Sequence, residues 1–218
     1  MIARAKEPEP ELRSGVVLPM AFAGDDATLV AALREHHPGA KAEFFDRHAA
    51  YLERVITRVI GLDRELSDIL QESFLSALSS LHTLRDPRAL KPWLAQIAAQ
   101  TARKVLRSRS RRRWLRLFVD ADDEARWDQP VAEHEPGTLR ALHGVYAVLG
   151  ELPTDDRITF ALRFVEGMDL QEVAAACGVS LSTVKRRLSR AETRFLMLAR
   201  DKPELSEWLA GGSRWNDQ

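Results

Sequence analysis

Apolar positions in the first half of the chain recur at steps of three and four residues, the period of amphipathic helices. Asp25 or Asp26 can cap the first helix, which Pro38 and Gly39 end. Gly61 ends the second helix, the third helix begins near Ser67, and the fourth helix begins at Asp86-Pro87 or slightly later. The positions expected to be buried are, in the first helix, Leu29, Val30 and Leu33; in the second, Phe44, Phe45, His48, Leu52, Val55, Ile56, Val59 and Ile60; in the third, Leu70, Phe74, Ala77, Leu78 and Leu81; and in the fourth, Trp93, Leu94, Ile97, Ala98, Thr101 and Val105. These four helices are expected to form one domain.

The second half of the chain is also helical in pattern. Residues 139–150 and 154–166 predict two helices separated by Leu152-Pro153, and Gly167 follows them. No segment shows the two-residue alternation of a strand. The fold class is therefore predicted to be all-α, with two small helical domains joined by a flexible acidic linker.

A helix-turn-helix is predicted over residues 170–190. Asp169 can cap its first helix, with Glu172 three residues later completing a capping box. Gly178 tolerates the positive φ of the turn, Ala174 permits close helix contact, and Ser180 can cap the second helix. On that helix the inward positions are Val184, Leu188, Ala191, Phe195 and Leu198.

The outer face of this second helix is polar and basic, which favours reading of duplex DNA in the major groove. Arginine and lysine bond guanine edges, and hydroxyls bond bases or phosphates. The alternative is a helix pair with a merely solvated basic face. The residues predicted to bind DNA here are Ser182, Thr183, Lys185, Arg186, Arg187, Ser189 and Arg190.

Charge is strongly segregated, although 32 basic and 32 acidic residues give no net charge. Eight basic and no acidic residues lie in 101–117, whereas 119–137 holds seven acidic residues and one arginine. The first stretch favours phosphate binding over a solvated helix end, and the second predicts a linker. The predicted organisation is a mobile tail (1–24), a first domain (25–117), the acidic linker (118–137), a second domain (138–200) and a C-terminal extension (201–218).

Other chemistries find little support in the sequence. Cys177 is the one cysteine and is expected to be a small core residue, so neither a disulfide nor a zinc site is predicted. No Gly-rich phosphate loop or nucleophile beside a base is present, so neither enzymatic activity nor a cofactor is expected. No apolar segment reaches the roughly 20 residues of a membrane span, which predicts a cytoplasmic protein without membrane insertion.

The third helix carries a further candidate surface opposite its buried stripe. Asp68 and Glu72 lie four residues apart, with Gln71 at the edge and Leu75 on the same outer side. An exposed leucine beside carboxylates is consistent with a protein partner. Taken alone, an ordinary solvated acidic face explains the same pattern.

Two long segments resemble bacterial sigma factors. SDILQESFLSAL resembles their region 2.2 helix, and the similarity continues through KPWLAQIAAQTARKVLRSRSRRR. The segment LGELPTDDRITFALRFVEGMDLQEVAAACGVSLSTVKRRLSRAETRF resembles region 4. Over residues 25–198, the chain resembles a group IV sigma factor of the extracytoplasmic-function type.

The resemblance implies a function and a set of roles. Asp68, Gln71, Glu72 and Leu75 would contact the β′ coiled coil of core RNA polymerase, and Lys185, Arg186, Ser189 and Arg190 would read the −35 promoter element. The residues implied to bind the −10 element are Arg85, Arg88, Lys91, Gln100, Arg103, Lys104 and Arg107. The implied partners are core polymerase, through its β′ coiled coil and β flap, and promoter DNA. An anti-sigma factor is a further candidate partner, because group IV members are often held by one. A stand-alone helix-turn-helix repressor or activator remains the alternative.

Overall fold

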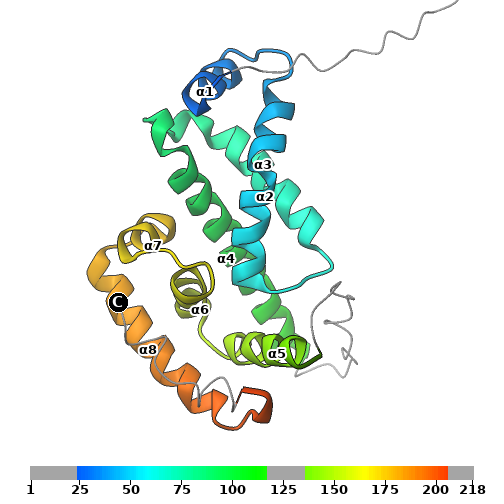
Figure 1. The fold of residues 1–218 in the computed structure, drawn as a ribbon, viewed down its shortest axis with the longest axis vertical. Helices are drawn as coiled ribbons and strands as arrows, with labels where there is room; N and C mark the ends of the chain where they lie inside the picture. Colours follow the sequence, from blue (N-terminus) through cyan, green and yellow to red (C-terminus); the bar gives the residue numbers. More distant parts are fainter. Residues whose placement is uncertain (1–23, 117–135, 206–218) are drawn as a thin grey trace, which may run out of the picture.

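The computed structural model describes residues 24–116 and 136–205, which are helical with short connections (Figure 1). The N-terminal half contains α1 (Asp26–Arg34), α2 (Ala40–Ile60), α3 (Leu66–Ser80), η1 (Leu81–Thr83), η2 (Pro87–Ala89) and α4 (Leu90–Arg116). The C-terminal half contains α5 (Pro136–Gly150), α6 (Thr154–Phe160), η3 (Ala161–Val165), α7 (Leu170–Cys177), α8 (Leu181–Ala199) and η4 (Pro203–Leu205). The predicted all-α fold class is confirmed.

Local signals placed several helix ends correctly. The Asp25 side chain accepts a hydrogen bond of 2.9 Å from the backbone N–H of Thr28 and starts α1. Gly61, with φ of 92°, ends α2. Asp86 caps the short turn η2, which leads directly into α4. These ends depend on residues close in sequence, which is why the pattern was sufficient to predict them.

The N-terminal core is centred on α2. Phe44 is fully buried and meets the ring of Phe74 edge-on at 5.5 Å. Phe45, predicted to be buried, is instead 45% exposed, because a residue adjacent to Phe44 on a helix points about 100° away from it. On α3, Phe74 and Ala77 are buried as predicted, whereas Leu70 and Leu78 are only half-buried. Ile69 and Ser73, which were not predicted, are buried as well, so the inward face is wider than the predicted stripe.

Helix α4 is buried on two sides. The predicted stripe contains Leu94 and Ile97, but Ala95, Ala99 and Ala102 are buried as well. The reason is that α2 and α3 pack on one side of α4, and α6 and α7 pack on another (Figure 1). Small alanine side chains allow neighbouring helix axes to approach closely. The two halves of the chain therefore meet along α4.

The buried residues form two clusters. The larger joins the N-terminal core to side chains of α6, α7 and the start of α8, including Ile158, Val173 and Val184. The smaller lies among α5, α6, α8 and η4, where the rings of Phe160 and Phe195 stack at 4.8 Å. Two helical domains are present in the sequence pattern, but their apolar interiors are continuous through α4.

The expected helix over 154–166 changes character midway. After α6 the chain makes a π-helical turn, η3, in which the N–H of Glu166 donates to the carbonyl of Ala161 at 2.9 Å. Gly167 then adopts φ of 85° and turns the chain toward α7. This wider turn orients α7 for its packing against α4.

The predicted tail, acidic linker and most of the C-terminal extension lie outside the described residues. Of the extension, residues 201–205 are described, and Leu205 is completely buried against α5. A Cβ on Gly144 of α5 would lie 2.7 Å from Glu204 Cγ and 3.1 Å from Leu205 Cγ, so a larger residue there would require these side chains to shift. Within the described ranges, no helix is long and apolar enough to cross a membrane.

Candidate nucleic-acid interface

The helix-turn-helix is formed by α7 and α8, as predicted. The Asp169 carboxylate accepts hydrogen bonds from the N–H groups of Gln171 at 2.7 Å and Glu172 at 2.8 Å. The Glu172 carboxylate in turn accepts from the Asp169 N–H at 2.8 Å, which completes the capping box. Gly178 takes φ of 66° in the turn, and the Ser180 hydroxyl accepts from the Thr183 N–H at 3.3 Å.

Helix α8 separates apolar and polar residues onto two faces. Val184, Leu188, Ala191 and Phe195 are buried, and Leu198 is half-buried. On the opposite side, the exposed residues are Ser182, Lys185, Arg186, Ser189 and Arg190, whereas Thr183 and Arg187 are partly covered. The start of α8 therefore presents hydroxyls and basic groups together, as a helix that enters a DNA major groove requires.

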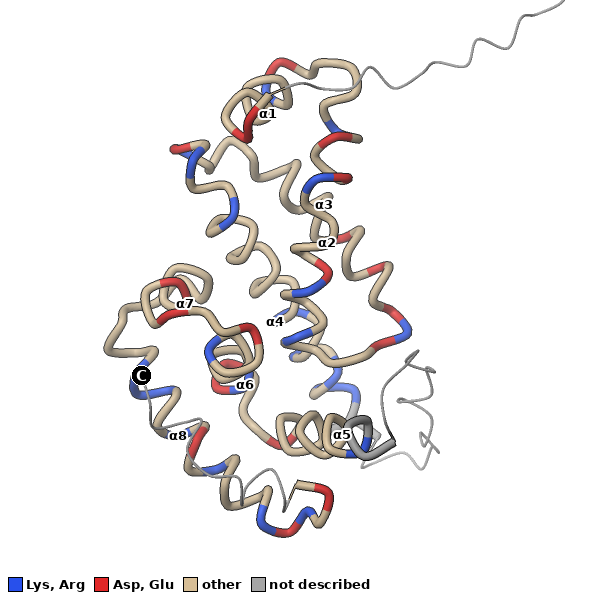
Figure 2. Tube along the Cα trace, in the orientation of Figure 1, with Lys and Arg blue, Asp and Glu red and all other residues tan. Residues whose placement is uncertain are grey.

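A second basic surface runs from η2 along α4. In Figure 2, lysine and arginine lie near the start of α4 and again in its second part, with an uncharged stretch between them; in the sequence that stretch is residues 92–102. Most residues predicted for the −10 element are exposed there: Arg85, Arg88, Lys91, Gln100, Lys104 and Arg107. Arg103 is partly covered. Trp93 is half-buried against the core, and its indole N–H donates to the Thr83 hydroxyl at 3.1 Å.

Part of the basic block, the stretch of residues 101–117 with eight basic side chains, contributes to the fold. The Arg109 guanidinium contacts Asp63 and also donates to the Glu65 carboxylate at 2.9 Å. Both acids lie in the segment that connects α2 to α3, so Arg109 fixes that segment against α4. The prediction that the whole block binds phosphate therefore does not fit Arg109.

The acidic surface predicted on α3 is exposed. Asp68, Gln71 and Glu72 all face outward, and Leu75 is 61% exposed, the largest fraction among the exposed large apolar residues. Lys104 Nζ lies 3.6 Å from the Glu72 carboxylate, so this surface borders the basic surface of α4.

Two acids on α6, absent from the sequence prediction, link the basic surfaces. The Asp155 carboxylate accepts hydrogen bonds from Arg103 Nε at 2.8 Å, Arg107 Nη2 at 3.4 Å and Arg187 Nη2 at 3.3 Å. The Asp156 carboxylate accepts one from Arg190 Nη2 at 2.7 Å. Burial alone would raise the pKa of the Asp155 carboxyl, but the Arg103 hydrogen bond and the charges of Arg187, Arg103 and Arg107 together hold it below the ordinary value.

Cys177 lies inside the helix-turn-helix core. It is 6% exposed, and its sulfur is 3.9 Å from the Thr159 hydroxyl. Burial raises the pKa of the thiol, which keeps it protonated and unreactive near neutral pH. Cys177 thus acts as a small core residue. In the part of the chain that the structure describes, no cluster of His, Cys, Asp and Glu suits a metal ion.

Comparison with known families accounts for both halves of this arrangement. The Sigma-70 region 2 family matches residues 44–112, which include most of α2, all of α3 and most of α4. The Sigma-70 region 4 family matches residues 142–195, which include α7 and most of α8. The chain belongs to the sigma-70 family, in its extracytoplasmic-function group IV.

Several named sigma factors are similar over most of their length. RNA polymerase sigma factor SigV of Bacillus subtilis is 30% identical over 165 residues, which cover 76% of this chain and 87% of SigV. CnrH of Cupriavidus metallidurans is 26% identical over 79% of this chain and 93% of its own. Family membership identifies the protein as a factor for promoter recognition and transcription initiation.

Two solved structures share the fold. CnrH in complex with the cytosolic domain of CnrY has a TM-score of 0.54 and 22% identity, covering 81% of this chain and 98% of that one. RpoE of Bartonella quintana in complex with the anti-sigma factor NepR has a TM-score of 0.54 and 21% identity, covering 73% and 96%. Both support the two-part helical architecture.

Proposed function

We propose that this sigma factor divides promoter recognition between its two basic surfaces, with α8 reading the −35 element and α4 binding the −10 element. The observation that carries this proposal is the pair of exposed basic helices in one chain, on the two segments that match sigma regions 2 and 4. A sigma factor lends sequence specificity to RNA polymerase, so the activity requires no catalytic residue in this chain. We infer that it is not an enzyme and acts in the cytoplasm with polymerase.

The proposed −35 contacts come from the outer face of α8. Lys185, Arg186 and Arg190 supply groups that can bond base edges, and the hydroxyls of Ser182, Thr183 and Ser189 can bond bases or phosphates. Arg187 leaves the helix sideways, which suits a phosphate. The proposed domain that carries this helix extends over residues 138–200.

The proposed −10 contacts extend from the turn before α4 into its first half. Arg85, Arg88 and Lys91 surround η2, while Gln100 and Lys104 lie further along α4. Arg103 and Arg107 would join them when they are not bound to Asp155. Their positive charge can stabilise a locally opened strand through its phosphates. The proposed domain that includes them extends over residues 25–117.

Core polymerase is the proposed partner of the α3 surface. Leu75 is exposed beside Asp68, Gln71 and Glu72, so an apolar contact is surrounded by acceptors for basic side chains. This surface is proposed to bind the β′ coiled coil, and the second domain to bind the β flap. Because CnrH and RpoE were solved with CnrY and the anti-sigma factor NepR, we also propose that an anti-sigma factor regulates this chain.

Capture of core polymerase provides the decisive experiment. The purified full chain is mixed with core polymerase, and in vitro transcription is then measured on a pool of genomic fragments. Wild type should form a holoenzyme and initiate at a limited set of promoters. The double variant Asp68→Ala plus Glu72→Ala should bind core polymerase at least about tenfold more weakly, because two charged contacts are lost.

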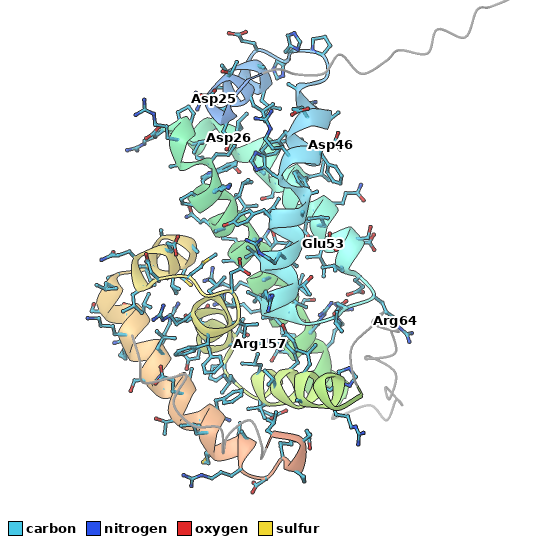
Figure 3. The ribbon with its side chains drawn as sticks, viewed as in Figure 1. Asp25, Asp26, Asp46, Glu53, Arg64 and Arg157 are labelled. Atoms are coloured by element: carbon cyan, nitrogen blue, oxygen red, sulfur yellow. The ribbon has the colours of Figure 1, made fainter. Side chains whose placement is uncertain are left out.

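A matched control separates surface chemistry from total charge. Asp46→Ala plus Glu53→Ala removes two exposed acids from α2, whose positions Figure 3 shows, and should leave polymerase binding unchanged. If the Asp68 and Glu72 variant binds core polymerase as tightly as wild type does, the proposed polymerase surface is rejected. A stand-alone regulator would instead bind DNA without polymerase, as a dimer on symmetric half-sites.

A further inference from the structure

The two basic surfaces are bound to the same pair of acids. Asp155 and Asp156 occupy the first turn of α6, between α4 and α8 (Figure 1). Asp155 contacts two arginines of α4 and one of α8, at 2.8 to 3.4 Å, and Asp156 contacts another of α8 at 2.7 Å. The four arginines are Arg103, Arg107, Arg187 and Arg190. All four belong to the residues proposed above to bind promoter DNA.

We propose that Asp155 and Asp156 form an acid clasp that closes the free sigma factor and competes with DNA phosphates for these arginines. The inference rests on the proposed DNA-binding roles of α4 and α8. A carboxylate and a phosphate bond a guanidinium through the same N–H donors. Each arginine in the clasp must therefore leave its carboxylate, at least in part, before it makes a full contact with DNA.

Burial makes the clasp more effective than a surface ion pair. Asp156 and the side chain of Arg187 are largely covered, with exposed fractions of 6% for the Asp156 side chain and 15% for that of Arg187. Arg187 Nη1 is buried without a hydrogen-bond partner, so this guanidinium is only partly satisfied in the closed state. A phosphate could satisfy the donors that the clasp leaves unused.

The surrounding contacts favour the same closed arrangement. Helix α7 packs along α4, and a Cβ placed on Gly178 of the DNA-reading turn would lie 3.8 Å from Gln96 of α4. Arg54 of α2 donates to Glu166, beyond η3, at 2.9 Å. The helix-turn-helix is thus held against the helix that carries the second DNA surface. Two surfaces so close together cannot engage two separated promoter elements, so promoter binding requires the clasp to open.

The test compares charge-matched variants of the isolated full chain. Asp155→Asn plus Asp156→Asn keeps the side-chain shapes but removes both negative charges. Asp46→Asn plus Asp201→Asn removes the same charge from exposed sites that are absent from the clasp. The probe is a fluorescent random-sequence DNA duplex at low salt. We expect the clasp variant to bind this DNA about tenfold more tightly than wild type does. The affinity of the control variant should differ from that of wild type by less than about twofold.

A second readout does not depend on DNA. Small-angle X-ray scattering should give a larger radius of gyration for the clasp variant than for wild type, and circular dichroism should show unchanged helix content. If the double variant loses helix content, Asp155→Asn alone is used, because Asp155 is the more exposed acid. Equal gains in DNA binding by clasp variant and control, or an unchanged radius of gyration, would overturn the clasp.

Transcription separates this inference from the proposed function. When assembled with saturating core polymerase, the clasp variant should initiate at the same promoters as wild type, because the clasp is already open in that complex. Failure of wild-type holoenzyme to initiate would reject the proposed function, whatever the clasp variant does alone. Normal initiation by wild type combined with unchanged DNA binding by the isolated clasp variant would reject the clasp alone.

Discussion

The Asp169 side chain controls the start of the DNA-reading unit. It satisfies two N–H groups of α7, and Glu172 completes the capping box. Asp169→Ala should lower the free energy of unfolding by about 1 kcal/mol, because both N–H groups lose their acceptor. Urea denaturation followed by circular dichroism measures this change. Gln171→Ala is the control, and an equal loss in that variant would show that the cap has no special role.

His48 should make the stability of the protein depend on pH. Burial lowers its pKa, the charges of Arg47 and Lys91 act in the same direction, and Asp26, 3.5 Å away, partly opposes them. The unfolded chain therefore binds more protons than the folded chain between the folded pKa and the ordinary value of about 6.5. The contribution of neutral His48 to the free energy of unfolding is therefore fully present above that range, and it is lost as the pH falls through the range.

Thermal melts at two pH values test this prediction. Because a single group titrates, the free energy of unfolding should fall by at most about 1.4 kcal/mol per pH unit below pH of about 6.5. His48→Leu should remove most of this dependence, whereas His82→Leu, which changes an exposed histidine, should retain it. A pH dependence that survives in His48→Leu would assign it to other groups.

Residues with local partners were predictable, and those with distant partners were not. Asp25, Asp169 and Ser180 bond N–H groups two or three positions away, so their roles can be identified in the sequence itself. Asp155 bonds Arg103, which is 52 positions away. In the sequence, Asp155 and Asp156 indicate only acids in the first turn of a helix, where they are common in any case.

The turn between α7 and α8 is an element whose shape depends on one glycine. Gly178 adopts φ of 66°, which costs other residues roughly 1–2 kcal/mol. Gly178→Ala should destabilise the protein by about that amount, since a Cβ there meets only Gln96 Nε2 at an ordinary 3.8 Å. Gly150→Ala, at the end of α5, adds a Cβ in open space and should be neutral or slightly stabilising. Equal effects in urea denaturation would contradict this explanation.

Helices α8 and α4 should contribute differently to DNA binding. Arg186→Ala, on the outer face of α8, should change which upstream bases are preferred, at a cost of about 1–3 kcal/mol on the preferred sequence. Lys104→Ala should weaken binding to all sequences and reduce the salt slope by about 0.9 per lost duplex phosphate contact, or about 0.7 on a single strand. Selection from a random DNA pool and binding at several salt concentrations measure the two effects. Equal changes in base preference would reject this division.

Helix α4 shows why element positions were easier to predict than element surroundings. Its start follows from Asp86-Pro87, and its predicted apolar positions from Trp93 to Val105 all lie within the helix that the structure shows. Its second buried side consists largely of alanines, such as Ala95, Ala99 and Ala102, which occur equally on exposed helix faces. Nothing in such a pattern indicates that α7, far away in the sequence, covers them.

At the scale of the whole molecule, the two helical units are joined by polar as well as apolar contacts. Arg157 of α6 donates to the carbonyls of Val59 at 3.1 Å and Ile60 at 2.7 Å, and the Tyr146 hydroxyl of α5 donates to the carbonyl of Thr57 at 3.1 Å. The last carbonyls of a helix have no partners within it, and a cation at this end is favoured by the helix dipole. The C-terminal helices thus cap the end of α2.

This shared cap should make the free chain unfold as one unit. Arg157, which Figure 3 shows where α6 meets the N-terminal helices, is 8% exposed. Arg157→Met keeps the apolar stem but removes charged hydrogen bonds worth about 1.5–3 kcal/mol each. Scanning calorimetry should show one transition for wild type and two for the variant, because the halves then lose part of their coupling. Arg64→Met, at an exposed position, should keep the single transition, and a single transition in both variants would mean that the apolar contacts along α4 suffice to couple the halves.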